Sequence, residues 1–302
     1  MPVSGPILLT GVNGQVGNEL LQTLAPLGQI VSASRDQLDL TSPESIRRVI
    51  REVRPAVVVN AAAYTAVDQA ESEPELTFAV NATAPQIMAE EVARLNGLLI
   101  HYSTDYVFDG SKTSPYTEED EPNPVGIYGK SKLAGEKAIR ETEIPHLILR
   151  TSWVYGGRGR NFLKTIIRLA RERHDLGVVS DQIGCPTSSR AIANATAVML
   201  GEWQTERSGT YHVTCAGETS WHGFAQAILR FYEAHRAAQG WPPLKVTADA
   251  VRAITTEEYP TPAIRPAYSV LNNAKLLTTF HISMPLWSEA LSAVVRELKV
   301  ET

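Results

Sequence analysis

Short apolar runs alternate with amphipathic stretches through the first half of the chain. Between these runs, apolar residues recur at the spacing of one helix face. Continuous apolar strands that are separated by helices predict a parallel sheet covered on both faces, a doubly wound α/β fold. The predicted strands are Ile7–Thr10, Ile30–Ala33, Val57–Asn60, Leu98–Ser103 and Leu147–Thr151, and the predicted helices are Gln15–Leu24, Pro43–Val53, Pro74–Asn96 and Tyr128–Glu141.

The regular alternation weakens beyond residue 152, where glycine-rich and proline-rich segments interrupt it. This change predicts a second, smaller lobe that is built from non-contiguous pieces. We expect the first domain to span residues 1–151, with a return of the chain to it around 187–215. The second lobe then lies mainly in residues 152–302.

Composition and charge narrow the classes of function. The formal net charge of −5 argues against nucleic acid or an anionic membrane surface as the main partner. The chain has no apolar stretch long enough for a membrane span and no signal-peptide pattern at its start. Its two cysteines and seven scattered histidines show neither a disulfide framework nor metal-ligand spacing. We therefore expect a cytoplasmic protein without a metal site.

A glycine-rich turn follows the first predicted strand and opens the first predicted helix. Its sequence is Gly11-Val-Asn-Gly-Gln-Val-Gly17. Glycines here allow a tight turn, close approach of the backbone to a pyrophosphate, and close packing of helix on strand. The spacing differs from the more usual G-x-G-x-x-G, and a simple strand-to-helix turn is the alternative. We favour a Rossmann-type NAD(P) site whose candidate residues are Gly11, Asn13, Gly14, Gln15, Val16 and Gly17.

The end of the second strand indicates which dinucleotide binds. Ser34 and Arg35 stand where an acidic residue would bind the adenosine ribose, and an arginine there suits a 2′-phosphate. This favours NADPH, with NADH as the alternative, although Arg35 could equally be a solvated surface residue. Further candidate cofactor contacts are Asp39, Leu40, Ala62, Ala63, Tyr64 and Thr65.

Tyr128 and Lys132 carry the strongest catalytic signal. Four residues apart on a helix, they lie on the same face, where a lysine ammonium can lower the pKa of a phenol. Thr104, at the end of the fourth predicted strand, can donate a hydrogen bond to a substrate carbonyl while Tyr128 protonates it. Since Tyr-x-x-x-Lys also arises by chance, the glycine turn and Thr104 are needed to favour a hydride-transfer site.

These features resemble the extended short-chain dehydrogenase/reductase family, and within it the dTDP-4-dehydrorhamnose reductases, over nearly the whole chain. The matching segments occur in order. They are Gly14-Gln-Val-Gly17, Asn60-Ala-Ala-Ala63, Thr65-Ala-Val-Asp68, Ala70-Glu-Ser-Glu-Pro74, His101-Tyr-Ser-Thr-Asp-Tyr-Val-Phe108, Leu133-Ala-Gly-Glu-Lys137, Arg150-Thr-Ser-Trp-Val-Tyr155, Pro186-Thr187 and Tyr259-Pro-Thr-Pro262.

The resemblance implies reduction of the 4-keto group of dTDP-4-dehydro-L-rhamnose, a nucleotide sugar, to dTDP-L-rhamnose. It implies that Tyr128 is the proton donor, that Lys132 binds the nicotinamide ribose and that Thr104 completes the triad. It also places Tyr102 at the cofactor, and Asp105 and Trp153 at the sugar. In the second lobe, Arg265 is a candidate for the nucleotide pyrophosphate, because a guanidinium matches phosphate oxygens.

Two departures and three alternatives stay open. Arg190 stands where some relatives carry an acidic residue of a proposed magnesium-linked dimer contact, so we predict no metal, and a homodimer is neither favoured nor excluded. The preference for NADPH at Arg35 is the other departure. A 4,6-dehydratase would need a second carboxylate where Tyr106 stands, whereas an epimerase is harder to exclude from residues. A non-catalytic subunit resembling the methionine adenosyltransferase β subunit is the third alternative.

Overall fold

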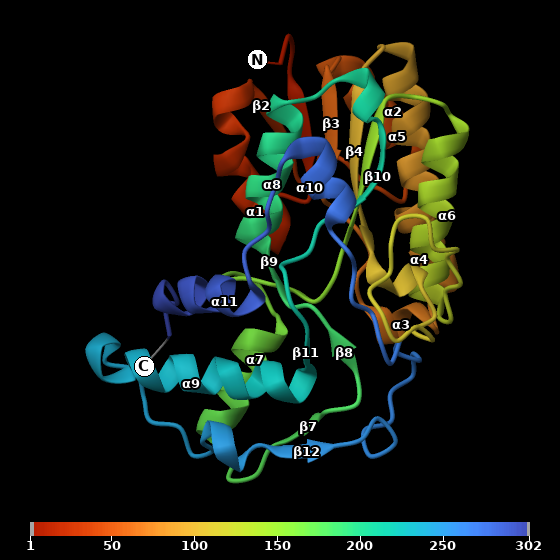
Figure 1. Ribbon diagram of the computed structural model, residues 1–302. Helices are drawn as coiled ribbons and strands as arrows, with labels where there is room; N and C mark the ends of the chain where they lie inside the picture. Colours follow the sequence, from red (N-terminus) through yellow and green to blue (C-terminus); the bar gives the residue numbers. More distant parts are fainter. Residues whose placement is uncertain (1–2, 301–302) are drawn as a thin grey trace.

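The computed structural model describes residues 3–300 and centres on a six-stranded parallel sheet (Figure 1). The strand order is β10-β5-β4-β3-β1-β2. β2 lies on one side of β1, and the later strands are added on the other side, as in a doubly wound fold. The strands are β1 Ile7–Thr10, β2 Ile30–Ala33, β3 Val57–Asn60, β4 Leu98–Thr104, β5 His146–Thr151 and β10 Gly209–His212. The predicted fold class is therefore confirmed.

Helices cover both faces of this sheet. Leu9, Val59 and Ile100 belong to the core beneath α1 Gln15–Thr23 and α8 Ser189–Gly201. The alternate residues Leu8, Val58 and Leu99 belong to the core on the opposite face. That face is covered by α2 Pro43–Val53, α5 Ala84–Arg94 and α6 Ile127–Glu141. The side-chain alternation of the strands explains why both faces are apolar.

One predicted helix is interrupted. The stretch expected over Pro74–Asn96 forms α4 Pro74–Phe78, a π-helical turn at Ala79–Thr83 and α5. Asn81, buried in the π turn, exchanges hydrogen bonds with the backbone N–H and C=O of Tyr64 and donates to Ser131 Oγ. The wider turn therefore binds the loop after β3 and the start of α6, which a continuous α-helix pattern does not reveal.

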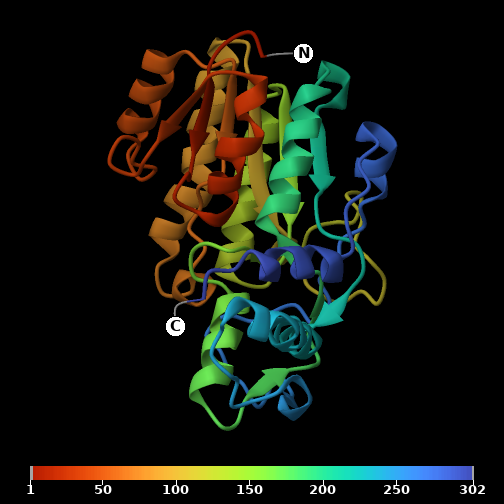
Figure 2. The same ribbon diagram turned by 90° about the vertical axis from the view of Figure 1, so that its left-hand side faces the viewer.

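The second lobe lies beyond the end of the sheet towards which β10 points (Figure 2). Its core is formed by the long helices α7 Phe162–Glu172, α9 Trp221–Gln239 and α11 Trp287–Arg296. Between α7 and α9 the chain returns to the sheet through α8 and β10. On the basis of this chain path, we propose that the protein is divided into two lobes.

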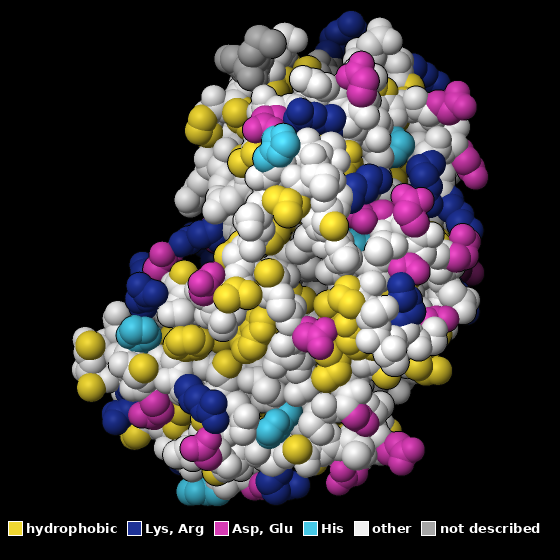
Figure 3. Space-filling view, viewed as in Figure 1, with side chains coloured by type: hydrophobic (Ala, Val, Ile, Leu, Met, Phe, Trp, Pro, Cys, Tyr) yellow, Lys and Arg dark blue, Asp and Glu magenta, His cyan; other side chains and the backbone are white. Residues whose placement is uncertain are grey.

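Short elements complete the structure. The remaining strands pair as β6 Val154–Tyr155 with β9 Thr187–Ser188, β7 Gly177–Val179 with β12 Arg252–Ile254, and β8 Ile183–Gly184 with β11 Thr219–Ser220. The remaining helices are α3 Val67–Ala70 and α10 Ala274–Phe280, and 3₁₀ turns lie at Ala25–Leu27, Asp105–Val107, Thr205–Arg207 and Ala248–Ala250. On the face seen in Figure 3, acidic and basic side chains are interspersed, and hydrophobic side chains gather near the middle.

Candidate active site

The glycine turn between β1 and α1 is close-packed. Gly11 has φ of 70°, and a Cβ there would lie 2.6 Å from the carbonyl carbon of Ala61. A Cβ at Gly17 would lie 2.6 Å from the carbonyl carbon of Gly11 and closer still to its oxygen. Both positions therefore require glycine. Gly14 is the N-cap of α1 and offers no side-chain cap.

The start of α1 has the properties of an anion site. The first turn of any α-helix leaves backbone N–H groups without partners in the helix, and no side chain caps them here. The first turn of α1 also carries no acidic residue. The helix dipole favours negative charge at this end. The turn thus fits the pyrophosphate of a dinucleotide.

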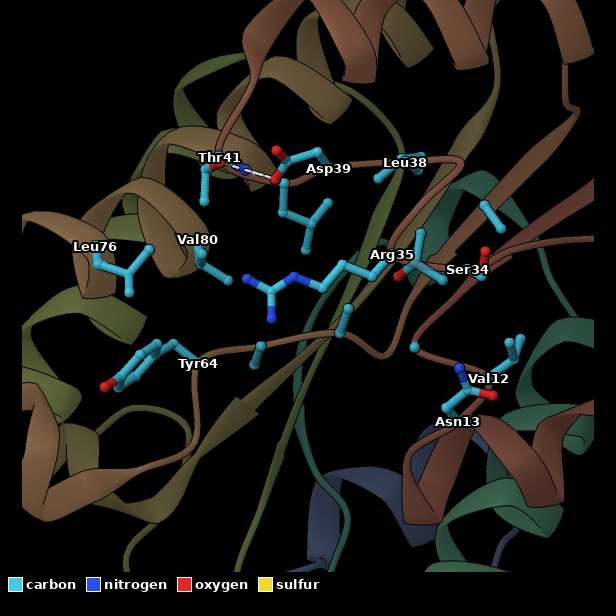
Figure 4. Close-up of a pocket in the computed structure, with 16 residues that line it drawn as sticks. Val12, Asn13, Ser34, Arg35, Leu38, Asp39, Thr41, Tyr64, Leu76 and Val80 are labelled. Carbon is cyan, nitrogen blue, oxygen red and sulfur yellow. Dashed lines mark hydrogen bonds between the residues drawn. The ribbon is translucent and has the colours of Figure 1, made fainter.

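A pocket of about 300 Å³ adjoins this turn (Figure 4). Arg35 extends across it towards Val80, and no hydrogen bond or ion pair holds its guanidinium within residues 3–300 (Figure 4). Asp39 instead accepts hydrogen bonds from the N–H and hydroxyl of Thr41. A free guanidinium over a nucleoside-sized pocket fits a 2′-phosphate. The predicted cofactor residues that line the pocket are Gly11, Asn13, Ser34, Arg35, Asp39, Leu40, Ala62, Ala63 and Tyr64.

The other predicted cofactor residues lie outside this pocket. Gly14, Gln15, Val16 and Gly17 form the start of α1, Thr65 is exposed just beyond Tyr64, and Tyr102, Tyr128 and Lys132 lie at β4 and α6. Gln15 Oε1 accepts a hydrogen bond of 2.8 Å from Asn161, and Tyr102 shares one of 2.7 Å with Thr196. The predicted contacts therefore form two groups, one around the pocket and one near α6.

Lys132 is buried, and its Nζ donates to the carbonyl oxygen of Tyr102 at 2.6 Å and lies 3.1 Å from Nε2 of His101. Burial lowers the pKa of Lys132 to about 8, against the raising effect of Glu136. The expectation that its ammonium lowers the pKa of the Tyr128 phenol is not met. Burial raises that pKa to about 12, and Asp105 adds to the rise, while the Thr104 hydroxyl opposes it.

Thr104 has a different hydrogen-bonding role from the one expected. Its hydroxyl donates to Asp105 Oδ1 at 3.0 Å and accepts from the N–H of Tyr106. A hydroxyl has one hydrogen, so while Asp105 is ionised this hydrogen is not available to a substrate carbonyl. Thr104 lowers the pKa of Tyr128 only when its hydroxyl donates this hydrogen to the phenolate oxygen of Tyr128 instead of to Asp105.

Asp105 is 1% exposed, and its Oδ2 has no hydrogen-bond partner within residues 3–300. Burial raises its pKa to about 6, although the hydroxyls of Ser269 and Thr104 oppose this effect. An unpartnered carboxylate oxygen beside Thr104 and Tyr128 suits a hydroxyl of a bound sugar.

Trp153 and Arg265 are both engaged with protein groups. Trp153 has φ of 45° and stacks on Trp221 with ring centroids 3.5 Å apart, and a Cβ on Gly184 would clash with its ring. Its indole therefore has less free face for a sugar than the sequence suggested. Arg265 forms two hydrogen bonds with the Asp68 carboxylate, at 2.9 and 3.0 Å. An incoming phosphate must compete with Asp68.

Several residues near the site were missed from the sequence. Val12, Leu38, Thr41, Leu76 and Val80 line the pocket beside the predicted residues. Thr10, Asn60 and His101 form a buried hydrogen-bonded row that ends at Lys132. The polar residues in otherwise apolar strands were the only available signal for this row.

No group of three or more His, Cys, Asp and Glu side chains suited to a metal ion is found among residues 3–300. Arg190 instead pairs with Glu297 at 2.8 Å and with Glu19 at 3.4 Å. No helix in the described part of the chain is long and apolar enough to cross a membrane.

Comparison with known proteins assigns the family. The model of the family described as the RmlD substrate binding domain matches residues 5–300. The chain belongs to this family. It is 50% identical over 298 residues to the dTDP-4-dehydrorhamnose reductase of Burkholderia thailandensis, covering 97% of this chain and 98% of that protein. Identity to the Escherichia coli K12 enzyme of the same name is 42% over 302 residues, covering 98% and 99%.

Solved structures agree with this assignment. The dTDP-4-dehydrorhamnose reductase of Bacillus anthracis in complex with NADP matches with a TM-score of 0.88 at 36% identity, covering 98% of this chain and 100% of that chain. A UDP-glucose 4-epimerase of Thermus thermophilus matches with a TM-score of 0.78 at 20% identity, over 96% of this chain and 98% of its own. The second match shows a shared fold alone. The resemblance inferred from the sequence motifs is thus confirmed.

Proposed function

We propose that this protein reduces the 4-keto group of dTDP-4-dehydro-L-rhamnose to give dTDP-L-rhamnose, with NADPH as the reductant, in the last step of dTDP-rhamnose biosynthesis for cell-surface polysaccharide. The observation that carries the proposal is the convergence of Thr104, Tyr128 and Lys132 at the end of β4, at the same edge of the parallel sheet as the glycine turn that follows β1. Membership of the family supports the same reaction.

NADPH supplies the hydride when bound. Tyr128 stays protonated at neutral pH because its pKa is raised, so it can donate its proton to the oxygen that gains charge as the ketone is reduced. The tyrosinate that is left is stabilised when the Thr104 hydroxyl donates its hydrogen to the phenolate oxygen instead of to Asp105. The remaining N–H of the Lys132 ammonium would donate to a ribose hydroxyl.

The proposed cofactor contacts divide between the two ends of NADPH. Arg35 and Ser34 would hold the 2′-phosphate, and the start of α1 would hold the pyrophosphate. The guanidinium of Arg35, which has no hydrogen bond or ion pair within residues 3–300, supports NADPH over NADH.

The proposed sugar contacts are Thr104, Asp105 and Trp153, with Arg265 at the nucleotide phosphates. Asp105 is supported by its unpartnered Oδ2. Trp153 offers an indole edge, since Trp221 covers one face. Arg265 faces Asp68 of α3, and a diphosphate would replace the Asp68 carboxylate as the partner of its guanidinium. We propose a cytoplasmic location. A homodimer is possible, and a measurement of the oligomeric state in solution tests it.

The test is loss of NADPH absorbance with enzymatically prepared dTDP-4-dehydro-L-rhamnose, with NADH run in parallel. The proposal expects rapid oxidation of NADPH and slower oxidation of NADH. Saturable NADPH binding without oxidation would reject the proposed substrate and favour another keto-sugar or a regulatory subunit. A tightly retained dinucleotide with interconversion of sugar epimers would favour an epimerase.

A further inference from the structure

A polar row crosses the sheet at the last residues of β1 and β3 and in the middle of β4. Thr10 of β1, Asn60 of β3 and His101 of β4 are neighbours in register. They are 2%, 0% and 1% exposed, respectively. The row one pleat earlier on the same face, Leu8, Val58 and Leu99, is wholly apolar. The polarity is therefore confined to the edge where the candidate site lies.

Hydrogen bonds join this row to the catalytic lysine. Thr10 Oγ1 lies 2.7 Å from Asn60 Oδ1, and the Asn60 amide lies 3.1 Å from His101 Nδ1. His101 Nε2 lies 3.1 Å from Lys132 Nζ. Burying three polar side chains is unfavourable unless each is satisfied, and apolar residues would pack here without that cost. Packing alone therefore does not explain why these three residues are polar.

Lys132 depends on this row because no carboxylate pairs with it within residues 3–300. Glu136, one turn further along α6, is bound by Arg150 at 2.7 Å and by Arg140 at 3.2 Å. The buried Lys132 Nζ is held by two neutral groups, the Tyr102 carbonyl and His101 Nε2. Removing His101 leaves one anchor and frees Nζ to move away from the end of β4.

The protonation of the row follows from its chemistry. The pKa of His101 is well below its ordinary value because of burial and the Lys132 charge, so the imidazole is neutral. In the structure the Asn60 NH₂ faces His101 Nδ1, and Asn60 Oδ1 accepts from Thr10 Oγ1 and from the N–H of Ala62. With Lys132 charged, Nε2 accepts and Nδ1–H donates, so the Asn60 amide must turn its oxygen towards His101 and its NH₂ towards Thr10. With Lys132 neutral, every donor and acceptor along the row is reversed. The His101 tautomer therefore follows the charge of Lys132.

We propose that His101, anchored by Asn60 and Thr10, is a positioning residue that fixes Lys132 Nζ for the proposed reduction. This inference rests on the proposed function for its kinetic readout. The residue acts through Lys132 and touches neither the substrate nor the cofactor in the reaction that we propose.

The kinetic test compares His101→Leu with His101→Gln, whose amide oxygen can still accept from Lys132. We expect His101→Leu to lower kcat by up to about 10²-fold, as misplacement of a catalytic group by about 1 Å can. The dissociation constant for NADPH should rise by a smaller factor, and His101→Gln should recover part of kcat. His212→Leu is the matched control, because it removes a fully buried histidine from β10 of the same sheet.

The pH profile separates positioning from a structural role. The titratable groups that act on Lys132 and His101 are these two residues themselves and Glu136. Loss of an acceptor destabilises the ammonium, so the alkaline limb of kcat/KM should move to lower pH in His101→Leu. A variant with reduced thermal stability but an unchanged kcat and pH profile would overturn the proposal.

A spectroscopic measurement covers the case in which His101→Leu does not fold. In the wild-type protein, the imidazole ¹⁵N signals of His101 should show a neutral ring whose tautomer changes as Lys132 titrates. The change should be absent in Lys132→Met. A tautomer independent of pH and of Lys132 would overturn the inference even if the keto-sugar proved not to be the substrate.

Discussion

Replacement of Gly17 by alanine tests the dinucleotide turn most sharply. The added Cβ would lie 2.6 Å from the carbonyl carbon of Gly11 and 3.0 Å from Cα of Val12. Both neighbours are backbone atoms, so no side chain can rotate away. Relief requires α1 to shift away from the turn by about 1 Å, to restore ordinary contact distances near 3.5–4.0 Å.

The size of the effect follows from this overpacking. Extra methyl groups in close-packed regions usually destabilise a protein by about 1–3 kcal/mol. At about 2 °C per kcal/mol for a protein of this size, Tm should fall by about 2–6 °C. The shift also displaces the free N–H groups of α1 from the pyrophosphate. Loss of one charge-assisted hydrogen bond alone weakens NADPH binding by about tenfold or more.

Two other glycines separate stability from binding. A Cβ on Gly14 would approach only the Gly11 oxygen, at 3.1 Å, and nothing lies within 4 Å of a Cβ on Gly157. Gly14→Ala should nearly keep Tm but bind NADPH less tightly, since in the proposed site the pyrophosphate would lie against that backbone. Gly157→Ala should change neither. Thermal unfolding and NADPH fluorescence titration measure both quantities, and wild-type NADPH affinity in Gly17→Ala and Gly14→Ala would refute this placement of the cofactor.

Four further outcomes follow from the site and its ion pairs. Tyr128→Phe should lower kcat by about 10²–10⁴-fold with NADPH affinity retained, and near-full turnover in steady-state assays would exclude it as proton donor. Arg35→Ser should weaken NADPH binding by about 10- to 100-fold and leave NADH binding unchanged in parallel titrations. Because the pKa of Asp105 is about 6 and that of Lys132 about 8, kcat/KM should be highest between these values and fall on either side, whereas a flat profile from pH 5 to 9 would contradict both assignments. Glu136→Gln should cost about 3–5 kcal/mol at neutral pH, seen in urea unfolding, because Arg150 stays buried without its partner. Burial opposes the ionised form of Glu136 but Arg150 lowers its pKa overall, so the wild-type contribution should be present above pH 4.5 and be lost as pH falls below it, a dependence absent from the variant.

Five of the six strands of the sheet were predictable because they are mainly apolar runs, whereas the mostly polar β10 Gly209–His212 was not among the predicted strands. β1, β2 and β3 begin and end at the predicted residues. Helix boundaries were nearly as clear. The interruption at Ala79–Thr83 was not predictable, because it depends on Asn81 reaching Tyr64 and Ser131, which are remote in sequence.

The candidate site shows the same division between local and distant information. The glycine turn and the Tyr128–Lys132 spacing are local patterns, and the structure brings Thr104 to Tyr128 as expected. The pairing of Arg265 with Asp68 joins residues far apart in the chain, and the stacking of Trp153 on Trp221 depends on the second lobe. Neither contact leaves a periodic signal in the sequence.

The polar row shows how strand positions nearer the ligand edge differ from those nearer the start of each strand. In a parallel sheet, a residue inside a strand is surrounded by apolar side chains on both faces, so its best choice is apolar. The register row formed by the last residues of β1 and β3 and by His101 within β4 lies nearer the ligand edge and can exchange hydrogen bonds with a charged group from a helix. Thr10, Asn60 and His101 use this position to reach Lys132, while Leu8, Val58 and Leu99 stabilise the sheet directly beneath them. One change of residue class along each strand therefore separates the part that specifies the fold from the part that orients the catalytic lysine.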